Sequence, residues 1–342
     1  STGIALLSLY FFATIKLTDD LKDYRLSKWC LFYPLVCVIA VFMDGYSFMM
    51  FAVGSSIFIG TRWIGCGNSA LRKNWAKLLL PTHLLSFAFA YVLFALYIGR
   101  PSFSSHQLDF FRGWGVDLSF LVIPTHGMHW FPDILGWSVE RSNQLFWGDA
   151  SVWVTTFSFP VILGAIWSIF ILLKFKKNTV LVIAISGMAL FGFYMAMGPS
   201  VKVNTQKHES ESNARMMEAE HSIAPTGSAI LSKHLPGFNV MRASYRWAAL
   251  GIFGTWLLLL FPLSRSHGFV TISVAVAFHL IVILFNLPAF PSKIQEYTNN
   301  RSMFFLIDSD FVEPLTNDLN VGETVAFLPW RNDFLVSYSA SR

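Results

Sequence analysis

The sequence predicts an all-α polytopic membrane protein with about eight spans, interfacial helices in two long loops and the start of a small α/β domain. Three observations support this fold class. Hydrophobic residues make up 54% of the 342-residue chain and aromatic residues 16%. Charged residues make up only 13%, against roughly 25% in soluble domains. The apolar residues also gather in long runs, and a helix of about 20 such residues crosses a bilayer.

The apolar runs give the expected spans. The second and third runs are short and flank MDGYS, Met43 to Ser47. They are either two tilted helices hinged at this motif or a single kinked span, and we favour two because the charge pattern then stays consistent. The chain opens inside an apolar run without Met or a basic region, so we expect a longer N-terminal portion and not a signal peptide. The runs are 4–15, 31–42, 48–64, 78–97, 152–173, 180–197, 248–263 and 269–285.

Basic residues in the short connections predict the orientation. Lys and Arg are enriched in cytoplasmic loops, and here they fall in four alternate connections. The opposite, outer face then receives the long loops 99–151 and 198–246. Insertion alone explains the net charge of +5, so we expect no nucleic-acid partner. The basic residues are Lys16, Lys22, Arg25, Lys28, Arg62, Arg72, Lys73, Lys77, the KFKK motif at 174–177, and Arg265.

The chain divides into a transmembrane domain, 1–290, and the beginning of a C-terminal outer domain, 291–342. Alternating apolar patterns predict strands at 303–308 and 324–330, with a helix at 309–319 between them. This βαβ-like start does not close within the sequence, so we expect the domain to continue beyond it. The three cysteines lie in or beside apolar runs, and we expect no disulfide.

The first long loop contains an apolar stretch threaded with polar residues, GWGVDLSFLVIPTHGMHWFPDILGW. Its composition predicts re-entrant or interfacial helices with aromatic residues at headgroup depth. A carboxylate here is a candidate functional group or a helix cap, and the histidines are candidates for a binding groove or ordinary interfacial residues. His-x-x-His also ligates metals, but no further ligand is spaced with it, so we expect no metal. The candidates are Asp117, His126, His129, Trp130 and Asp133.

The second long loop ends in LPGFNVMRASYRW, which leads directly into an apolar run. The charged stretch 207–222 before it is expected to be an exposed helix or a flap. A spacing of four places Arg242 and Arg246 on one side of a helix, and guanidinium forks suit phosphate oxygens. Lys233 and His234 are further candidates for the same site. The alternatives are contacts with ordinary phospholipid headgroups, or snorkelling at the interface.

Four motifs give the chain a resemblance to the GT-C superfamily of polytopic membrane glycosyltransferases, including bacterial enzymes that modify O-antigen. The motifs are MDGYS, DLSFLVIPTHGMH, WGDASVWVTTFSFPVILG and LPGFNVMRASYR, in this order along the chain. The superfamily's acidic motif follows its first span, and we expect it in an N-terminal loop that precedes this sequence or has been lost. Within the sequence, Asp44 and Asp117 are therefore the candidate catalytic carboxylates, and Asp133 is a further substitute.

The resemblance implies transfer of a sugar from a polyprenyl-phosphate donor to a glycan or lipid-linked acceptor, on the outer face of a bacterial inner membrane. Arg242 and Arg246, with Lys233 and His234, would then hold the phosphate, and a carboxylate would act as general base. The loop 113–137 would line a groove for the prenyl chain. This chemistry needs no cofactor, and the sequence has no Gly-rich nucleotide-binding motif.

Two other classes of protein remain open at this point. A transporter or flippase is also polytopic, but it usually has inverted repeats and charges near the membrane midplane, whereas polar residues here crowd the outer loops. A non-catalytic envelope assembly protein would keep the groove without the chemistry.

Overall fold

The computed structural model describes residues 2–21, 28–99, 106–175, 178–263 and 268–320, together with residues 323 and 338. It is mostly helical and divides into two compact units, Ser1–Leu287 and Pro288–Arg342. The basic residues expected at Lys22, Arg25, Lys176, Lys177 and Arg265 lie outside the described residues, as does the strand expected at 324–330.

Apolar helices dominate the first unit. In chain order they are α1 (Thr2–Ala5), α2 (Leu7–Asp20), α3 (Trp29–Met43), α4 (Gly45–Ile64), α5 (Ser69–Asn74), the π-helix η2 (Trp75–Leu79), α6 (Leu80–Ile98), α11 (Phe159–Lys174), α12 (Thr179–Ala196), α14 (Ala248–Leu260), η7 (Phe261–Leu263) and α15 (Phe269–Phe285). Within the described residues, four helical stretches are long and apolar enough to cross a membrane: Gly45–Ile64, Ser69–Ile98, Thr179–Ala196 and Ser244–Leu263. Three apolar helices are shorter: α3, α11 and α15. These helices indicate a membrane protein, but they do not confirm the count of about eight spans.

The hinge expected at MDGYS is confirmed as a break between two helices. α3 ends at Met43, and Asp44 adopts an extended conformation with φ −171°. The Asp44 carboxylate then caps α4 by accepting hydrogen bonds from the backbone N–H groups of Tyr46 and Ser47, each at 3.3 Å. An Asp before a helix satisfies amide groups that have no partner within the helix, so the motif ends one helix and begins the next.

The run expected as a single span at 152–173 is broken, and this prediction was wrong. A short helix, α10 (Ala150–Val154), ends before Thr155, and α11 begins at Phe159 with Pro160 in its first turn. Ser158, which precedes α11, has a non-helical φ of −149°. Ser158 also donates its backbone N–H to Leu121 O at 3.0 Å, which ties the break to the first long loop.

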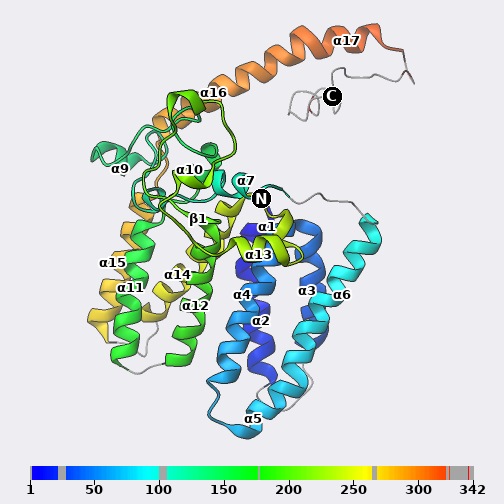
Figure 1. The fold of residues 1–342 in the computed structure, drawn as a ribbon, viewed down its shortest axis with the longest axis vertical. Coiled ribbons are helices and arrows are strands. Elements are labelled where there is room, and N and C mark those ends of the chain that lie inside the picture. Colours follow the sequence, from blue (N-terminus) through cyan, green and yellow to red (C-terminus); the bar gives the residue numbers. More distant parts are fainter. Residues whose placement is uncertain are drawn as a thin grey trace. The chain divides into compact units, whose positions relative to one another are not determined.

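The helices of the first unit place short and long connections at opposite ends (Figure 1). At one end lie α5 and the connection between α11 and α12. At the other end, here called the loop end, the residues 106–158 and 198–247 gather. The loop end contains α7 (Leu108–Gly113), α8 (Leu118–Val122), α9 (Trp130–Ile134), α10, β1 (Ser200–Val201), η3 (Glu209–Glu211), η4 (Ala219–His221), β2 (Ala224–Pro225), α13 (Ala229–His234), η5 (Phe238–Val240) and η6 (Ser244–Trp247).

Secondary structure at the loop end is short and irregular. β1 and β2 form a two-stranded antiparallel sheet in which Ser200 pairs with Pro225. The stretch 207–222, expected to be an exposed helix or a flap, forms only the 3-10 turns η3 and η4. The short helices α7, α8 and α9 agree with the helices expected in the first long loop, and their position relative to a membrane stays a prediction.

Small residues let α12 and α14 pack closely. A Cβ atom at Gly192 would collide with the backbone nitrogen of Gly251, and one at Gly254 would lie 2.8 Å from Ala189 Cβ. Close helix contact through small residues is typical of membrane helices, since lipid provides no hydrophobic drive for their association. This contact fixes the start of α14, which follows Arg246.

The second unit contains helix where the sequence predicted a strand. α16 (Phe290–Ile307) continues through the π-helix η8 (Asp308–Val312) into α17 (Glu313–Asp318). The strand predicted at 303–308 was therefore wrong, whereas helix is present where one was expected at 309–319. No Gly or Pro interrupts the chain between Ser292 and Glu313, so nothing local ends the helix before the apolar residues.

Candidate functional site

The hinge at Asp44 and the segment before α14 meet at the loop end, although they are far apart in sequence. The Tyr46 hydroxyl accepts a hydrogen bond from the backbone N–H of Ala243 at 2.8 Å. Gly3 of α1 packs on the same hinge, since a Cβ atom at Gly3 would lie 2.9 Å from Asp44 Cβ. Three distant parts of the chain therefore come together around Asp44 and Tyr46.

Arg246 lies over this hinge. Its guanidinium carbon is 4.7 Å from the centre of the Tyr46 ring and 6.0 Å from that of Tyr245. Stacking of this kind holds a guanidinium by cation–π attraction and leaves its N–H edge available to an anion. Asp44 is close enough to act electrostatically on Arg246.

Arg242 occupies a different environment from Arg246. The expectation that one helix carries both was wrong, because Arg242 follows η5 in an irregular stretch and Arg246 belongs to η6. Arg242 is exposed, with its guanidinium carbon 5.2 Å from the ring centre of Phe110 in α7. Both arginines still act electrostatically on Tyr46, so the two charges lie on one side of the molecule without sharing a helix face.

A cavity of about 810 Å³ opens beside Arg246. Its polar lining comes from Arg246, Tyr245 and two hydroxyl residues of the α10 region, and the rest of its lining is mainly apolar. The apolar residues of α14 extend from Ala248 to Trp256, which is about 12 Å along a helix. The cavity therefore combines one cation and a few hydroxyl groups, including that of Ser8, with a mainly apolar lining. Its lining residues are Ile4, Ala5, Leu7, Ser8, Ser151, Thr155, Tyr245, Arg246, Ala248, Ala249, Ile252, Phe253 and Trp256.

A second apolar cavity, of about 560 Å³, is lined by Tyr46. It lies between residues of α3, α4 and α6 on one side and the stretch 236–241 on the other. Tyr46 lines this cavity, whereas Arg246, stacked on the Tyr46 ring, lines the first. The stacked Tyr46 and Arg246 side chains thus lie between the two cavities.

Lys233 and His234 lie in the last turn of α13, and both are exposed. None of the contacts of Arg242 and Arg246 given above involves either residue. Their proposed part in holding a phosphate therefore has no geometric support from those contacts.

Asp117 lies in a buried network that joins the two long loops. Its side chain is 2% exposed and caps α8. Its two oxygens accept four hydrogen bonds, from Ser119 N at 2.8 Å, Ser119 Oγ at 2.7 Å, Asn204 N at 2.8 Å and Thr205 N at 2.8 Å. Two residues of the second loop thus depend on a carboxylate of the first. Because all four donors belong to the protein and the carboxylate is buried, Asp117 has the contacts of a structural group and is not open to a bound acceptor molecule.

Two cations accompany Asp117, of which Lys202 is buried and Arg141 is half-buried. Lys202 is 2% exposed and donates through Nζ to Arg112 O and Gly115 O, both at 2.6 Å. Burial lowers the pKa of Lys202 to about 8, while Asp117 opposes the shift. Burial likewise lowers the pKa of Arg141 to about 10, again opposed by Asp117. The carboxylate thus partly offsets the cost of burying two positive charges.

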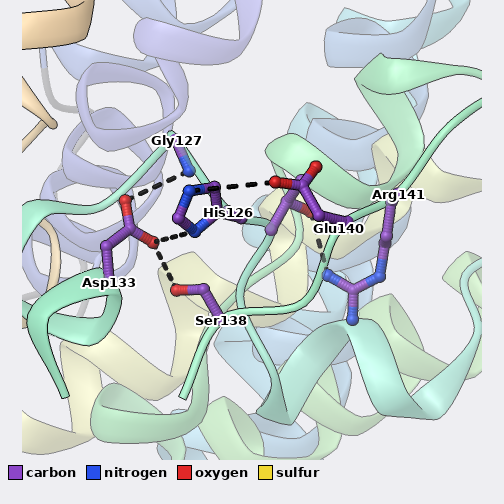
Figure 2. A network of polar contacts seen from close by, with 7 residues as sticks. His126, Gly127, Asp133, Ser138, Glu140 and Arg141 are labelled. Atoms are coloured by element: carbon purple, nitrogen blue, oxygen red, sulfur yellow. Dashed lines mark hydrogen bonds and ion pairs between the residues drawn. The ribbon is translucent and has the colours of Figure 1, made fainter. Parts of the chain in front are cut away.

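A second polar network closes the turn that carries His126 (Figure 2). His126 lies between two carboxylates, with Nδ1 3.7 Å from Asp133 Oδ1 and Nε2 3.8 Å from Glu140 Oε1. Asp133 also accepts hydrogen bonds from Gly127 N at 3.1 Å and from the Ser138 hydroxyl. The side chains of His126 and Glu140 are 54% and 83% exposed, whereas that of Asp133 is 15% exposed, so the network presents an imidazole and one acid to solvent.

Arg141 holds the base of the same turn. It donates to Thr125 Oγ1 at 2.9 Å and to Ile123 O at 3.0 Å, and it lies 4.7 Å from the ring centre of Phe120. These contacts link residues on both sides of the turn, which fixes the position of the His126 network without placing it in either cavity.

His129 and Trp130 complete the group predicted to form a substrate groove. The His129 ring packs on Phe157 at 5.2 Å, and burial lowers its pKa against the opposing effect of Asp133. Trp130 is 41% exposed and donates its backbone N–H to Leu287 O at 2.9 Å. The loop 113–137 contributes no lining residue to the two cavities described above, so its role as a groove wall stays a prediction.

Sequence reasoning missed three parts of this site. Tyr46 stood inside the hinge motif, but nothing local indicated that its ring meets Arg246. Lys202 is an isolated lysine in a polar stretch, and no pattern in the sequence indicated that it is buried. Ser151 was expected at the end of the first long loop, and Thr155 fell in a run expected to be a continuous span.

Comparisons of the chain with protein-family models, curated proteins and solved structures found no match. The fold and the site define this protein as a helical membrane protein. At its loop end, a mainly apolar cavity is lined by one cation, Arg246.

Proposed function

We propose that this chain is a membrane glycosyltransferase that uses a polyprenyl-phosphate-linked sugar and acts at the membrane face on which its loop end lies. The observation that carries the proposal is Arg246 at the polar end of an apolar cavity, stacked on Tyr46 and beside Asp44. A prenyl chain fits the apolar lining, and a phosphate fits the guanidinium.

The proposed step is a displacement at the anomeric carbon of the sugar. The acceptor hydroxyl oxygen bonds to that carbon while the carbon–oxygen bond to phosphate breaks, and the bonding electron pair leaves with the phosphate oxygen. Arg246 stabilises the charge that grows on the phosphate. Asp44 takes the hydroxyl proton as general base. We assign the base to Asp44 and not Asp117, because four donors surround the buried Asp117 carboxylate.

Substitution of Arg246 tests the proposal. Purified protein is reconstituted with a radiolabelled polyprenyl-phosphate hexose and bacterial envelope glycan as acceptor, and both lipid binding and transfer are measured. We expect Arg246→Ala to lower the transfer rate roughly 100- to 1,000-fold, as for loss of an oxyanion donor. Arg246→Lys should retain part of the binding but lose most of the transfer, because lysine keeps the charge without the fork.

Arg215→Lys is the matched control, because Arg215 is an exposed arginine of the same loop end and lies outside both cavities. A fully active Arg246→Lys variant would sink the proposed phosphate site. Polyprenyl-phosphate binding that depends on Arg246 without any transfer would instead favour a transporter or an envelope assembly protein.

A further inference from the structure

Three potential metal ligands converge in the second long loop, away from the cavities. His208, Glu211 and His221 each offer one ligand atom, and these atoms all lie within 4.8 Å of one another. His208 precedes η3, Glu211 ends η3 and His221 ends η4. In the part of the chain that the structure describes, no other group of three His, Cys, Asp or Glu residues converges in this way.

Two side-chain atoms of this group are shielded from solvent without a hydrogen-bond partner among the described residues. They are Glu211 Oε2 and His221 Nε2. His221 Nε2 lies 2.9 Å from Glu211 Oε1, yet the orientation of the ring makes no hydrogen bond to it. A buried polar atom without a partner destabilises the fold, and a cation bound between the two side chains would satisfy both.

The surroundings hold the imidazole of His221 in place. The centre of its ring lies 5.4 Å from that of the Trp147 ring and 5.9 Å from that of the His208 ring. The neighbouring cation, Lys207, donates to Asn143 O at 2.7 Å and lies 5.2 Å from the Trp147 ring centre. A second carboxylate, that of Glu220, lies 3.8 Å from His221 Nε2, so acidic groups outnumber the lysine around this point.

We propose that His208, Glu211 and His221 bind one Zn²⁺ ion. Two imidazoles and a carboxylate are a ligand set that zinc prefers, with water completing a tetrahedron. Ligand atoms around tetrahedral zinc lie about 3.4 Å apart, so the longest separation in the group must shorten by up to about 1.4 Å. Rotation of the exposed His208 side chain supplies this movement.

The ion would join η3 to η4 and hold the second loop together. This stretch contains no cysteine, and its two 3-10 turns provide little regular structure. A bound metal would replace the stabilisation that a disulfide or a core gives elsewhere. The role is structural and does not depend on the proposed sugar transfer.

Metal titration of the full chain in detergent tests this site. Zn²⁺ should bind at one ion per chain and raise the melting temperature of the wild type. Co²⁺ should give the visible absorption of a tetrahedral complex. His221→Gln and Glu211→Gln should each weaken Zn²⁺ binding roughly 10- to 100-fold or more, because each removes a direct ligand, and even outer-shell changes have effects of that size.

Glu220→Gln is the control, because its carboxylate is near the same nitrogen but lies outside the converging group. It should bind Zn²⁺ like the wild type. Equal binding in the wild type and in the His221→Gln and Glu211→Gln variants would overturn the proposal, as would a wild type whose melting temperature does not respond to Zn²⁺.

Discussion

Asp44 and Asp117 begin helices in the same way but have opposite surroundings. Each carboxylate accepts hydrogen bonds from the first backbone N–H groups of the helix that follows it. Asp117 is then covered by Asn204 and Thr205 of the second loop and is 2% exposed. Asp44 stays half-buried at a hinge, beside Arg246.

The difference shows that a capping position does not decide what a carboxylate does. Local sequence fixes the cap, because an Asp before a helix satisfies its first amides. Tertiary partners then decide whether the remaining oxygen lone pairs are used within the fold. At Asp117 the second loop uses them, and Asp44 lies within electrostatic reach of Arg246, which lines a cavity.

Asp44→Asn is expected to have the largest effect on transfer. Asparagine caps helices as well as aspartate does, so the fold should persist, but its amide cannot accept a proton. A general base typically contributes roughly 100- to 10,000-fold to the rate, and we expect a loss in this range. The transfer rate and the melting temperature are measured on the same preparation.

Asp149→Asn is the comparison for that variant. Asp149 caps α10 by accepting from Ser151 N at 2.9 Å and is half-buried like Asp44. The Asp149→Asn variant should transfer sugar at the wild-type rate. If both variants are equally active, Asp44 is not the base.

Asp117→Asn should act through stability. The side-chain amide of asparagine would place its own N–H group against backbone N–H donors. The substitution would also remove the negative charge that offsets the charges of Lys202 and Arg141. Breaking a buried charge interaction costs about 3–5 kcal/mol, which predicts a clearly lower melting temperature. Asp109→Asn, in a more exposed position, should change it little, and a stable but inactive Asp117→Asn would return Asp117 to the list of catalytic candidates.

The pH dependence of stability gives a smaller effect at the same network. Lys202 has a folded-state pKa of about 8, whereas a free lysine titrates near 10.4. Between these values the unfolded chain binds more protons than the folded one, so stability rises with pH across this window. Below pH 8 both states are protonated, and the folded state carries the full cost of the buried charge.

We therefore expect the melting temperature of the wild type to increase from pH 8 to pH 10 relative to a Lys202→Met variant, which lacks this group. Thermal unfolding of both proteins across that range measures the difference. Parallel curves would show that Lys202 keeps an ordinary pKa in the folded protein.

Much of the helical fold was predictable, because apolar composition and breakers are local signals. The break at Asp44 followed from Asp and Gly between two apolar runs. The break at Ser158 was missed, since Pro160 in a first turn reads like the interior of an apolar run until Leu121 is known to bind the backbone there. The strand expected at 303–308 failed because helix propagates through a short apolar stretch that no Gly or Pro interrupts.

The candidate site was harder to predict, because its geometry arises from distant contacts. Arg246 became a candidate because of its place before an apolar run. The spacing argument that paired it with Arg242 assumed a helix, and the chain instead forms two separate 3-10 turns. The meeting of Tyr46 with Ala243 has no signature in either segment.

The cavity beside Arg246 has walls that lie far apart in the sequence. Residues 4–8 form one wall, and residues 245–256 of the η6 and α14 region form the other. A ribosome completes the first wall long before the second, so the cavity cannot form until α14 has been translated. A chain arrested before Trp256 would have α1 and the start of α2 but no complete second wall.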